Sequence, residues 1–213
     1  MRIINKTKER QKGVVNMNAE IQNYSDNKRK KEMIDGKIYL MARPCDEHID
    51  VQDNLTMIFN SYFKRNKRKC RARTESQIYV NEKNYFEPDV KILCRESAEQ
   101  TRQNDDIPVI VVEVLSKSTG DRDKGVKMDK YAALGIKEYW IITWEAMLID
   151  IYLLNENKEY KEYKHYKSYS YYASEQELKR LDEDELREVV NEFSPVSFHE
   201  LTIKLEDVFD IFE

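Results

Sequence analysis

The sequence has few of the features that mark secreted, zinc-binding or membrane-spanning proteins. Its three cysteines, Cys45, Cys70 and Cys94, are odd in number and show no CxxC spacing. That pattern argues against a disulfide framework or a zinc site and fits a reducing compartment. The longest apolar run is about eight residues, well short of the roughly 20 that a membrane-spanning helix needs. The basic N-terminus lacks the apolar stretch of a signal peptide. We therefore expect a cytoplasmic protein with no membrane partner.

A strong excess of one charge is also missing. Charged residues make up 36% of the chain, yet the formal net charge is only -4. Mixed charge of this kind indicates a well-hydrated surface and gives no global signal for nucleic acid, so a DNA-binding hypothesis must rest on local basic patches. Two such patches occur, at residues 28–31 and 64–69. For both, a solvated surface competes with phosphate contact, and for the second the dipole of a preceding helix offers a further explanation.

At 213 residues the chain has the length of one domain. Residues 1–29 are polar and weakly periodic, which indicates a flexible or partly helical extension, and residues 30–213 then form a single domain. Residues 95–106 are hydrophilic and predict an exposed connection. The patterns predict helices at 48–65, from about 121 to 135, and at 174–193, and strands at 33–41 (with an Asp35-Gly36 turn), 71–80, 89–93, 108–115, 138–143 and 147–154, with a short strand and a final helix in 196–213.

A tract rich in tyrosine and lysine follows the last predicted hairpin. Tyr160, Tyr163, Tyr166 and Tyr169 recur every third residue, a period that suits neither a helix nor a strand well. One interpretation is a surface edge strand whose aromatic side chains pair across strands. The other is a strand that stacks on bases and contacts phosphates.

The most informative stretch is the apolar run 108–115, which carries one carboxylate, Glu113, in its middle. A carboxylate inside a buried strand is costly unless it is paired, protonated or metal-bound. Pro88 cannot donate to a sheet ladder, so the preceding strand begins at about Asp89. On neighbouring strands, Asp89 and Glu113 could converge on one Mg²⁺, with the backbone carbonyl of Val114 completing the shell. The alternative is a buried Glu113 paired with a lysine or arginine.

Phosphodiester cleavage also needs positive charge near the developing oxyanion. The helix from about residue 121 offers Lys124, Lys127 and Lys130. Lys127 shares a stripe with Tyr131 and Leu134, at i, i+4 and i+7, so it should face the sheet. Asp123 and Lys124 lie one turn earlier and remain candidates for substrate contact or for orienting Lys127.

Several motifs closely resemble the Uma-type family of restriction endonucleases, in the PD-(D/E)XK nuclease superfamily. The resemblance covers about Glu32 to Phe212 and is most specific in its central block. It rests on Asp35-Gly36 followed by His48, Glu87-Pro-Asp-Val90, Val112-Glu-Val-Leu-Ser116, Ser118-Thr119, Asp123-Lys-Gly-Val-Lys127, Tyr131, Gly135-Ile-Lys-Glu-Tyr-Trp140 and the segment 201–209.

This resemblance implies an α/β fold of restriction-endonuclease-like topology, with a central mixed sheet flanked by helices. It implies Asp89 and Glu113 as Mg²⁺ ligands, with Mn²⁺ as a substitute. The lysine usual two residues after the acidic ligand is here Leu115, and the resemblance implies that Lys127 replaces it. Further supporting residues would be Glu32, His48, Asp123, Lys124 and Tyr131.

The expected function is a Mg²⁺-dependent DNA endonuclease that hydrolyses phosphodiester bonds by a metal-activated water. Lys127 would polarise that water or stabilise the pentavalent transition state. A homodimer would ease double-strand cutting. The alternative is a non-catalytic nucleic-acid-binding or dimerisation module that retains the nuclease fold.

Overall fold

The computed structural model describes residues 30–95, 107–115, 123–157 and 161–212. The proposed N-terminal extension, nearly all of the connection at 95–106 and the turn at 116–119 lie outside the described residues.

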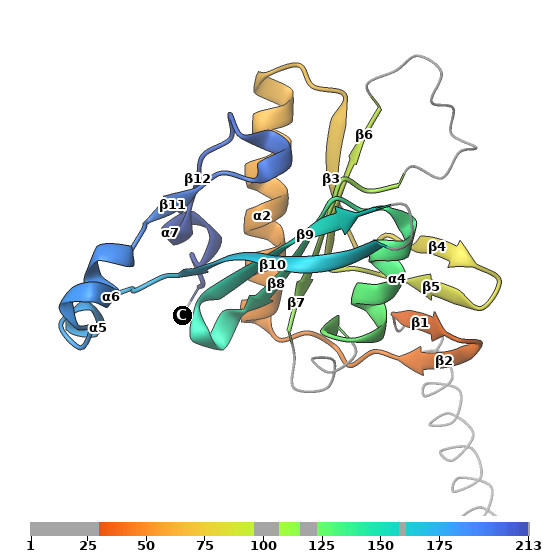
Figure 1. Cartoon of the computed structure of the whole chain (residues 1–213), viewed down its shortest axis with the longest axis horizontal. Coiled ribbons are helices and arrows are strands. Elements are labelled where there is room, and N and C mark those ends of the chain that lie inside the picture. Colours follow the sequence, from red (N-terminus) through yellow and green to blue (C-terminus); the bar gives the residue numbers. More distant parts are fainter. Residues whose placement is uncertain (1–29, 96–106, 116–122, 158–160, 213) are drawn as a thin grey trace, which may run out of the picture.

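The core of the protein is a six-stranded mixed sheet in the order β10-β9-β8-β7-β6-β3 (Figure 1). β7 and β8 run parallel and every other neighbouring pair is antiparallel. Every residue of β7 is buried, as expected for a central strand covered on both faces. The strands span Cys70–Thr74 (β3), Val90–Cys94 (β6), Ile110–Val114 (β7), Glu138–Thr143 (β8), Leu148–Glu156 (β9) and Lys161–Ser170 (β10).

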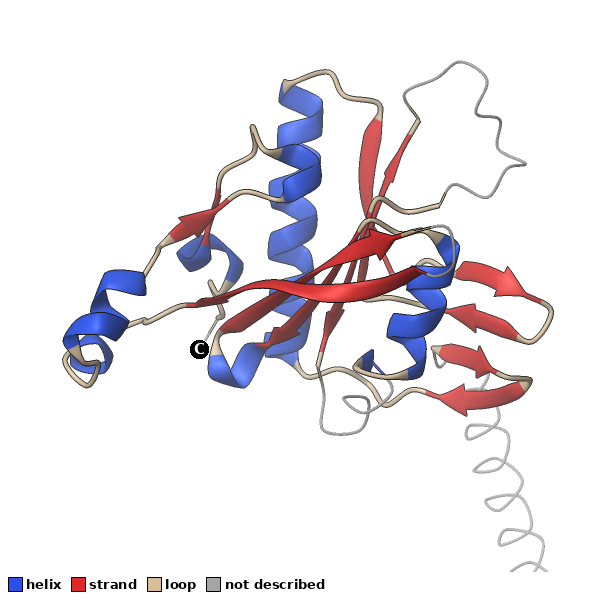
Figure 2. Ribbon diagram, in the orientation of Figure 1, coloured by secondary structure: helices blue, strands red, loops and turns tan. Residues whose placement is uncertain are grey.

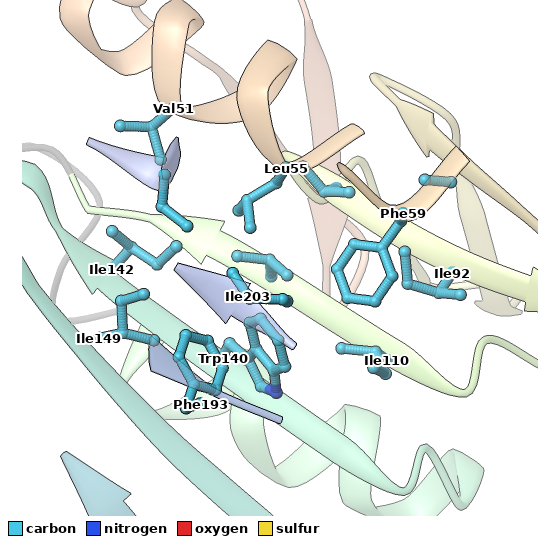
Figure 3. Close-up of a cluster of buried hydrophobic side chains, with 14 of the residues drawn as sticks. Val51, Leu55, Phe59, Ile92, Ile110, Trp140, Ile142, Ile149, Phe193 and Ile203 are labelled. Atoms are coloured by element: carbon cyan, nitrogen blue, oxygen red, sulfur yellow. The ribbon is translucent and has the colours of Figure 1, made fainter. Parts of the chain in front are cut away.

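One face of this sheet is covered by the long helix α2, Asp46–Arg65 (Figure 2). Its apolar residues recur on one side, and Val51, Leu55 and Phe59 pack onto Trp140 and its neighbours (Figure 3). The same cluster includes side chains from the C-terminal elements β11 (Glu192–Phe193), η2 (Val196–Phe198), β12 (Ile203–Lys204) and α7 (Leu205–Val208).

The opposite face carries the helix α4, Val126–Leu134, beside a small four-stranded sheet in the order β2-β1-β5-β4 (Figure 1). Tyr131 of α4 packs in a second apolar cluster with Val111 and Tyr139 of the large sheet. As predicted, Gly135 ends α4, in a left-handed conformation with φ 85°. The small sheet comprises Lys31–Ile34 (β1), Lys37–Leu40 (β2), Ile78–Asn81 (β4) and Asn84–Phe86 (β5).

The α/β fold with a central mixed sheet is therefore confirmed, as is the edge position of the tyrosine-rich tract. β10 is the outermost strand of the large sheet, and Tyr163 stacks on Tyr139 with ring centroids 5.5 Å apart. Tyr169 stacks on Phe193 in the same manner, while Tyr166 is exposed. Aromatic packing within the protein thus accounts for two of the tyrosines, although their partners lie on β8 and β11 rather than on the neighbouring strand β9, and base stacking stays a prediction.

Two strand predictions were wrong in extent because each stretch holds two strands rather than one. The stretch 71–80 forms β3 in the large sheet and β4 in the small one, separated at Glu75, whose φ is 46°. The predicted strand at 33–41 is an antiparallel hairpin of β1 and β2 around the Asp35-Gly36 turn. Alternating polar and apolar residues indicate an extended chain, but they do not indicate where one strand ends or which sheet it joins.

Two helix predictions near the C-terminus were also wrong. The stretch 174–193 holds α5 (Glu175–Leu178), α6 (Glu183–Glu188) and the strand β11 in place of one helix. Asp182 begins a second helix because its carboxylate accepts hydrogen bonds from the amides of Asp184 and Glu185. The final helix, α7, ends at Val208, and Phe212 lies beyond it with a 92% exposed side chain.

The structure contradicts the expectation that the cysteines remain unpaired. Cys70 of β3 and Cys94 of β6 form a disulfide, and only Cys45 is free. The antiparallel register of β3 and β6 places these two residues directly opposite each other. Cysteine count and spacing carry no information about strand register, so the sequence did not predict this contact. None of the described helices is both long and apolar enough to cross a membrane.

Loss of this disulfide is expected to lower the free energy of unfolding by about 3 kcal/mol, because it closes a loop between residues 24 apart in sequence. The Cys70→Ala/Cys94→Ala variant should melt roughly 6–12 °C below the native protein by calorimetry. Cys45→Ala is the matched control and should melt with the native protein. A titration that finds three free thiols in unreduced, denatured native protein would contradict the disulfide.

Candidate active site

The candidate site lies where β6 and β7 meet, on the α4 face of the large sheet. The antiparallel register pairs Val90 with Val112, and one further step sets Asp89 opposite Glu113. Side chains of directly opposed residues point to the same face of an antiparallel sheet, with Cβ atoms about 5 Å apart. A hydrogen bond from the Val114 amide to Asp89 Oδ2, 2.7 Å long, fixes the aspartate on this strand. The two predicted metal ligands therefore share one face of the sheet.

Glu113 contacts two side chains of α4. Its Oε1 accepts a hydrogen bond of 3.0 Å from the hydroxyl of Tyr131 and lies 3.2 Å from Lys127 Nζ. The two helix residues are four apart, so both reach the sheet from one face of α4. All three side chains are buried. The stripe of Lys127 and Tyr131 predicted from the sequence is confirmed.

Lys127 is surrounded by carboxylates from three different elements. Its Nζ lies 2.8 Å from Glu32 Oε1 of β1, in addition to its contact with Glu113 of β7. Asp123, just before α4, places Oδ1 2.9 Å from Nζ, at ion-pair distance but without hydrogen-bond geometry. The exposed fraction of Lys127 is only 1%. Glu32 also accepts a hydrogen bond from the Glu87 amide, which joins the small sheet to the site.

Asp89 has a different set of partners. Lys30, directly before β1, places Nζ 2.9 Å from Asp89 Oδ1. His48, in the first turn of α2, places Nε2 3.3 Å from the same oxygen. Asp89 thus contacts α2, β7 and the residue that precedes β1.

The pKa values of Asp89 and Glu113 are shifted in opposite directions. For Asp89, burial raises the pKa, but the contact with His48 and the charge of Lys30 outweigh burial and hold the pKa below its usual range. For Glu113, burial raises the pKa, and the charges of Asp123, Asp89 and Glu32 raise it further against the lowering effect of Lys127. For Lys127, burial lowers the pKa, but Glu113, Asp123 and Glu32 together raise it, so the ammonium stays charged.

The site holds more negative than positive charge. Four buried carboxyl groups, from Glu32, Asp89, Glu113 and Asp123, face the two lysines Lys30 and Lys127. Two formal negative charges remain when all these groups are ionised, and the exposed Arg43 and Glu75 on the same pocket wall add one charge of each sign. In addition, Glu32 Oε2 is buried without any hydrogen-bond partner. Unbalanced buried carboxylates are unfavourable, and a divalent cation would balance two charges.

The donor set therefore fits a hard divalent cation, although it is sparse. Among the described residues, no three or more histidine, cysteine, aspartate or glutamate side chains form a ready-made metal cluster. The predicted set has only two such side chains, Asp89 and Glu113, with a backbone oxygen as the third donor. Mg²⁺ is commonly held by one or two carboxylates and keeps several waters.

A pocket of about 60 Å³ opens onto these groups. Its wall includes Asp89, Glu113, Val114, Asp123 and Lys127, together with Lys30, Met41, Ala42, Arg43, Pro44, His48, Gln52 and Glu75. The predicted residues Asp89, Glu113, Val114, His48, Asp123 and Lys127 thus meet at one cavity.

Three of the predicted residues do not line the pocket. Glu32 and Tyr131 are buried behind it and reach the site through Lys127 and Glu113. Lys124 is exposed and is not part of the wall.

Among the wall residues that the sequence did not predict, Lys30 and Gln52 escaped prediction for different reasons. Lys30 had been considered only as part of a basic run, and no local pattern marks its contact with Asp89. Gln52 lies one helical turn after His48, and both are buried on the inward side of α2. A pair of polar residues four apart on an otherwise apolar helix face was a usable signal.

Comparisons with known proteins give consistent results. Residues 19–186 match the Uma2 family, described as "Putative restriction endonuclease". An uncharacterised protein, slr1290 of Synechocystis sp., is 28% identical over 134 residues, which are 62% of this chain and 70% of that protein. The crystal structure of a "putative nuclease belonging to DUF820" from Anabaena variabilis superposes with a TM-score of 0.59 at 16% identity, covering 84% of this chain and 89% of that one. At that identity the structural match supports the fold alone.

Proposed function

The chain belongs to the Uma2 family of restriction-endonuclease-like proteins, and from this premise we propose that it is a divalent-cation-dependent endonuclease that hydrolyses phosphodiester bonds in DNA. The observation that carries the proposal is the charge balance of the pocket. Four buried carboxyl groups face two lysines at a cavity that reaches the surface. A carboxyl group in excess of the lysines must either be protonated, which the raised pKa of Glu113 favours, or be balanced by a further cation such as a bound divalent ion.

Asp89 and Glu113 would hold the cation, with Val114 supplying a backbone oxygen. Bound there, Mg²⁺ or Mn²⁺ supplies a Lewis acid for the phosphate and lowers the pKa of a coordinated water. Lys127 stays protonated because three carboxylates surround its ammonium group. Its role is therefore to stabilise developing negative charge at the phosphate rather than to accept a proton. Tyr131 and Glu32 hold Glu113 and Lys127 in position, each through one direct contact.

His48 and Lys30 both contact the same oxygen of Asp89. Lys30 lines the same pocket, and like-charge repulsion would weaken its pairing with Asp89 if a cation were bound there. Lys30 then becomes available to a phosphate oxygen at the same pocket.

Removal of divalent cations is expected to abolish cleavage. Supercoiled plasmid incubated with the protein and millimolar Mg²⁺ or Mn²⁺ should convert to nicked or linear forms on a gel, and excess chelator should stop the conversion. Protein carrying Asp89→Asn, purified in parallel, should leave the plasmid supercoiled. Equal nicking by the variant would identify a contaminating nuclease, and undiminished cleavage in chelator would contradict the cation dependence.

A further inference from the structure

The proposed chemistry leaves one strongly charged feature of the chain unused. Residues 64–73 contain seven lysines and arginines and no acid, although the whole chain has a net charge of -4. All seven side chains are exposed. They run from the last turn of α2 into β3, the strand at one edge of the large sheet (Figure 1). Positive charge is therefore concentrated where the end of α2 meets β3.

The strand register directs two of these arginines toward the face that carries the site. Arg71 lies opposite Leu93 and Arg73 opposite Lys91, whereas Ala72 between them is buried in the α2 cluster. Lys91 in turn lies opposite Val111, two residues before Glu113 on β7. Because side chains alternate along a strand, Arg71 and Arg73 share the sheet face of Asp89 and Glu113.

The direction of β3 is fixed by a contact with α2. The Asn60 side chain accepts a hydrogen bond from the Ala72 amide and donates one to the Ala72 carbonyl. These two hydrogen bonds attach β3 to α2 along the edge of the strand that has no neighbouring strand among the described residues. Arg71 and Arg73 are the residues on either side of Ala72, so these hydrogen bonds also fix the position of their backbone.

The spacing of the arginines forms a line that leads away from the pocket. Glu75, which belongs to the pocket wall, comes directly after β3 ends at Thr74, and Arg73 and Arg71 lie on one face of that strand. At about 3.4 Å per residue, Arg71 and Arg73 lie roughly 7 Å apart along β3. Duplex DNA carries one phosphate charge per about 1.7 Å of its axis, so a duplex at the pocket would present several phosphates over this distance.

The dipole of α2 does not explain why Arg71 and Arg73 are positively charged residues. Lys64 and Arg65 lie in the last turn of α2, where cations are favoured. Arg71 and Arg73 belong to a strand beyond that helix, and neither makes an ion pair with a carboxylate of the described residues. Cations elsewhere on the surface do have such partners, for example Lys179 with Glu175, Arg187 with Glu183, and Lys204 with Glu206.

We propose that Arg71 and Arg73 of β3 form a phosphate-binding track that holds the backbone of duplex DNA beside the pocket. The inference rests on the proposed function for the identity of the polymer, and it adds the surface that the polymer occupies. The track recognises phosphate rather than base sequence, since guanidinium groups on an exposed strand edge reach the backbone first. Arg71 and Arg73 would contribute to DNA affinity and position the duplex, and the residues of the pocket would cleave the phosphodiester bond.

Binding can be measured without cleavage, so this inference and the proposed function can fail separately. A short fluorescein-labelled duplex is titrated with the full chain in chelator by fluorescence anisotropy, at salt concentrations from about 50 to 200 mM. The Arg71→Gln/Arg73→Gln variant should bind at least about tenfold more weakly near 0.1 M salt, and the slope of log K against log salt should shrink by about 2. Its melting temperature should be unchanged because both side chains are exposed.

Two controls separate the track from general charge effects. Lys179→Gln/Arg187→Gln removes the same charge at α5 and α6 and should leave affinity within about twofold of the native protein. Arg71→Lys/Arg73→Lys keeps the charge and should keep most of the salt slope. An unchanged slope in the glutamine variant, an equal loss in the α5/α6 control, or tighter binding of single-stranded RNA than of duplex DNA would overturn the inference.

Discussion

Replacement of Glu113 by glutamine is expected to reduce Mg²⁺-dependent DNA cleavage by at least about 100-fold. Even partners that only support a metal ligand typically contribute 10–100-fold to metal affinity or activity, so a direct ligand should contribute no less. Glutamine keeps the shape of the side chain and an oxygen that can accept the hydrogen bond from Tyr131. Lys127 retains Glu32 and Asp123 as partners. The loss should therefore be specific to cation binding.

Single-turnover cleavage rates across a Mg²⁺ titration measure this effect, and calorimetry in chelator checks that the variant folds. Glu162→Gln is the matched control, because Glu162 is an exposed carboxylate on the edge strand β10. That variant should cleave at the native rate. A Glu113→Gln protein with native activity would show that Glu113 is a buried, lysine-paired glutamate without a role in cleavage.

Replacement of Lys127 by methionine should affect stability as well as activity. Methionine fills a similar volume but leaves Glu32, Glu113 and Asp123 buried together without their shared cation. Removal of one partner of a buried ion pair typically costs about 3–5 kcal/mol. For a chain of this length the melting temperature in chelator should fall by roughly 6–20 °C. Millimolar Mg²⁺ should restore part of the loss, since a ligand that binds only the folded state stabilises it.

Lys130→Met provides the control on the same helix. Lys130 pairs with Asp35, but these side chains are 30% and 67% exposed, against 1% for Lys127. Loss of such a surface pair should cost less than about 1 kcal/mol. Calorimetry of both variants with chelator and with Mg²⁺ gives the comparison. Equal melting temperatures for the Lys127 and Lys130 variants would mean that the carboxylates around Lys127 do not depend on its charge.

Local patterns in the sequence predicted the elements that build the site. The apolar face of α2, the strand that starts after Pro88 and the end of a helix at Gly135 depend on neighbouring residues, and all occur as expected. The break at Glu75 and the Cys70–Cys94 disulfide depend on which strands pair and in what register. These contacts join residues that are distant in sequence, so no local period encodes them.

The same distinction applies to the site. Glu113 was conspicuous because a carboxylate interrupts an apolar strand, and Lys127 because a lysine shares a stripe with Tyr131. The contact between Lys30 and Asp89 joins residues 59 apart, and its existence depends on how the small sheet docks against the large one. The convergence of Glu32 and Asp123 on Lys127 likewise required the tertiary structure.

The central claim is that Asp89 and Glu113 bind one divalent cation between them, and anomalous diffraction from crystals grown with Mn²⁺ tests it most directly. The predicted result is one Mn²⁺ peak in the pocket, with a carboxylate oxygen of Asp89 and one of Glu113 each at about 2.1 Å. A Mn²⁺ peak away from these residues, or a native-like pocket in which Lys30 and Lys127 still hold both carboxylates at saturating Mn²⁺, would contradict the claim.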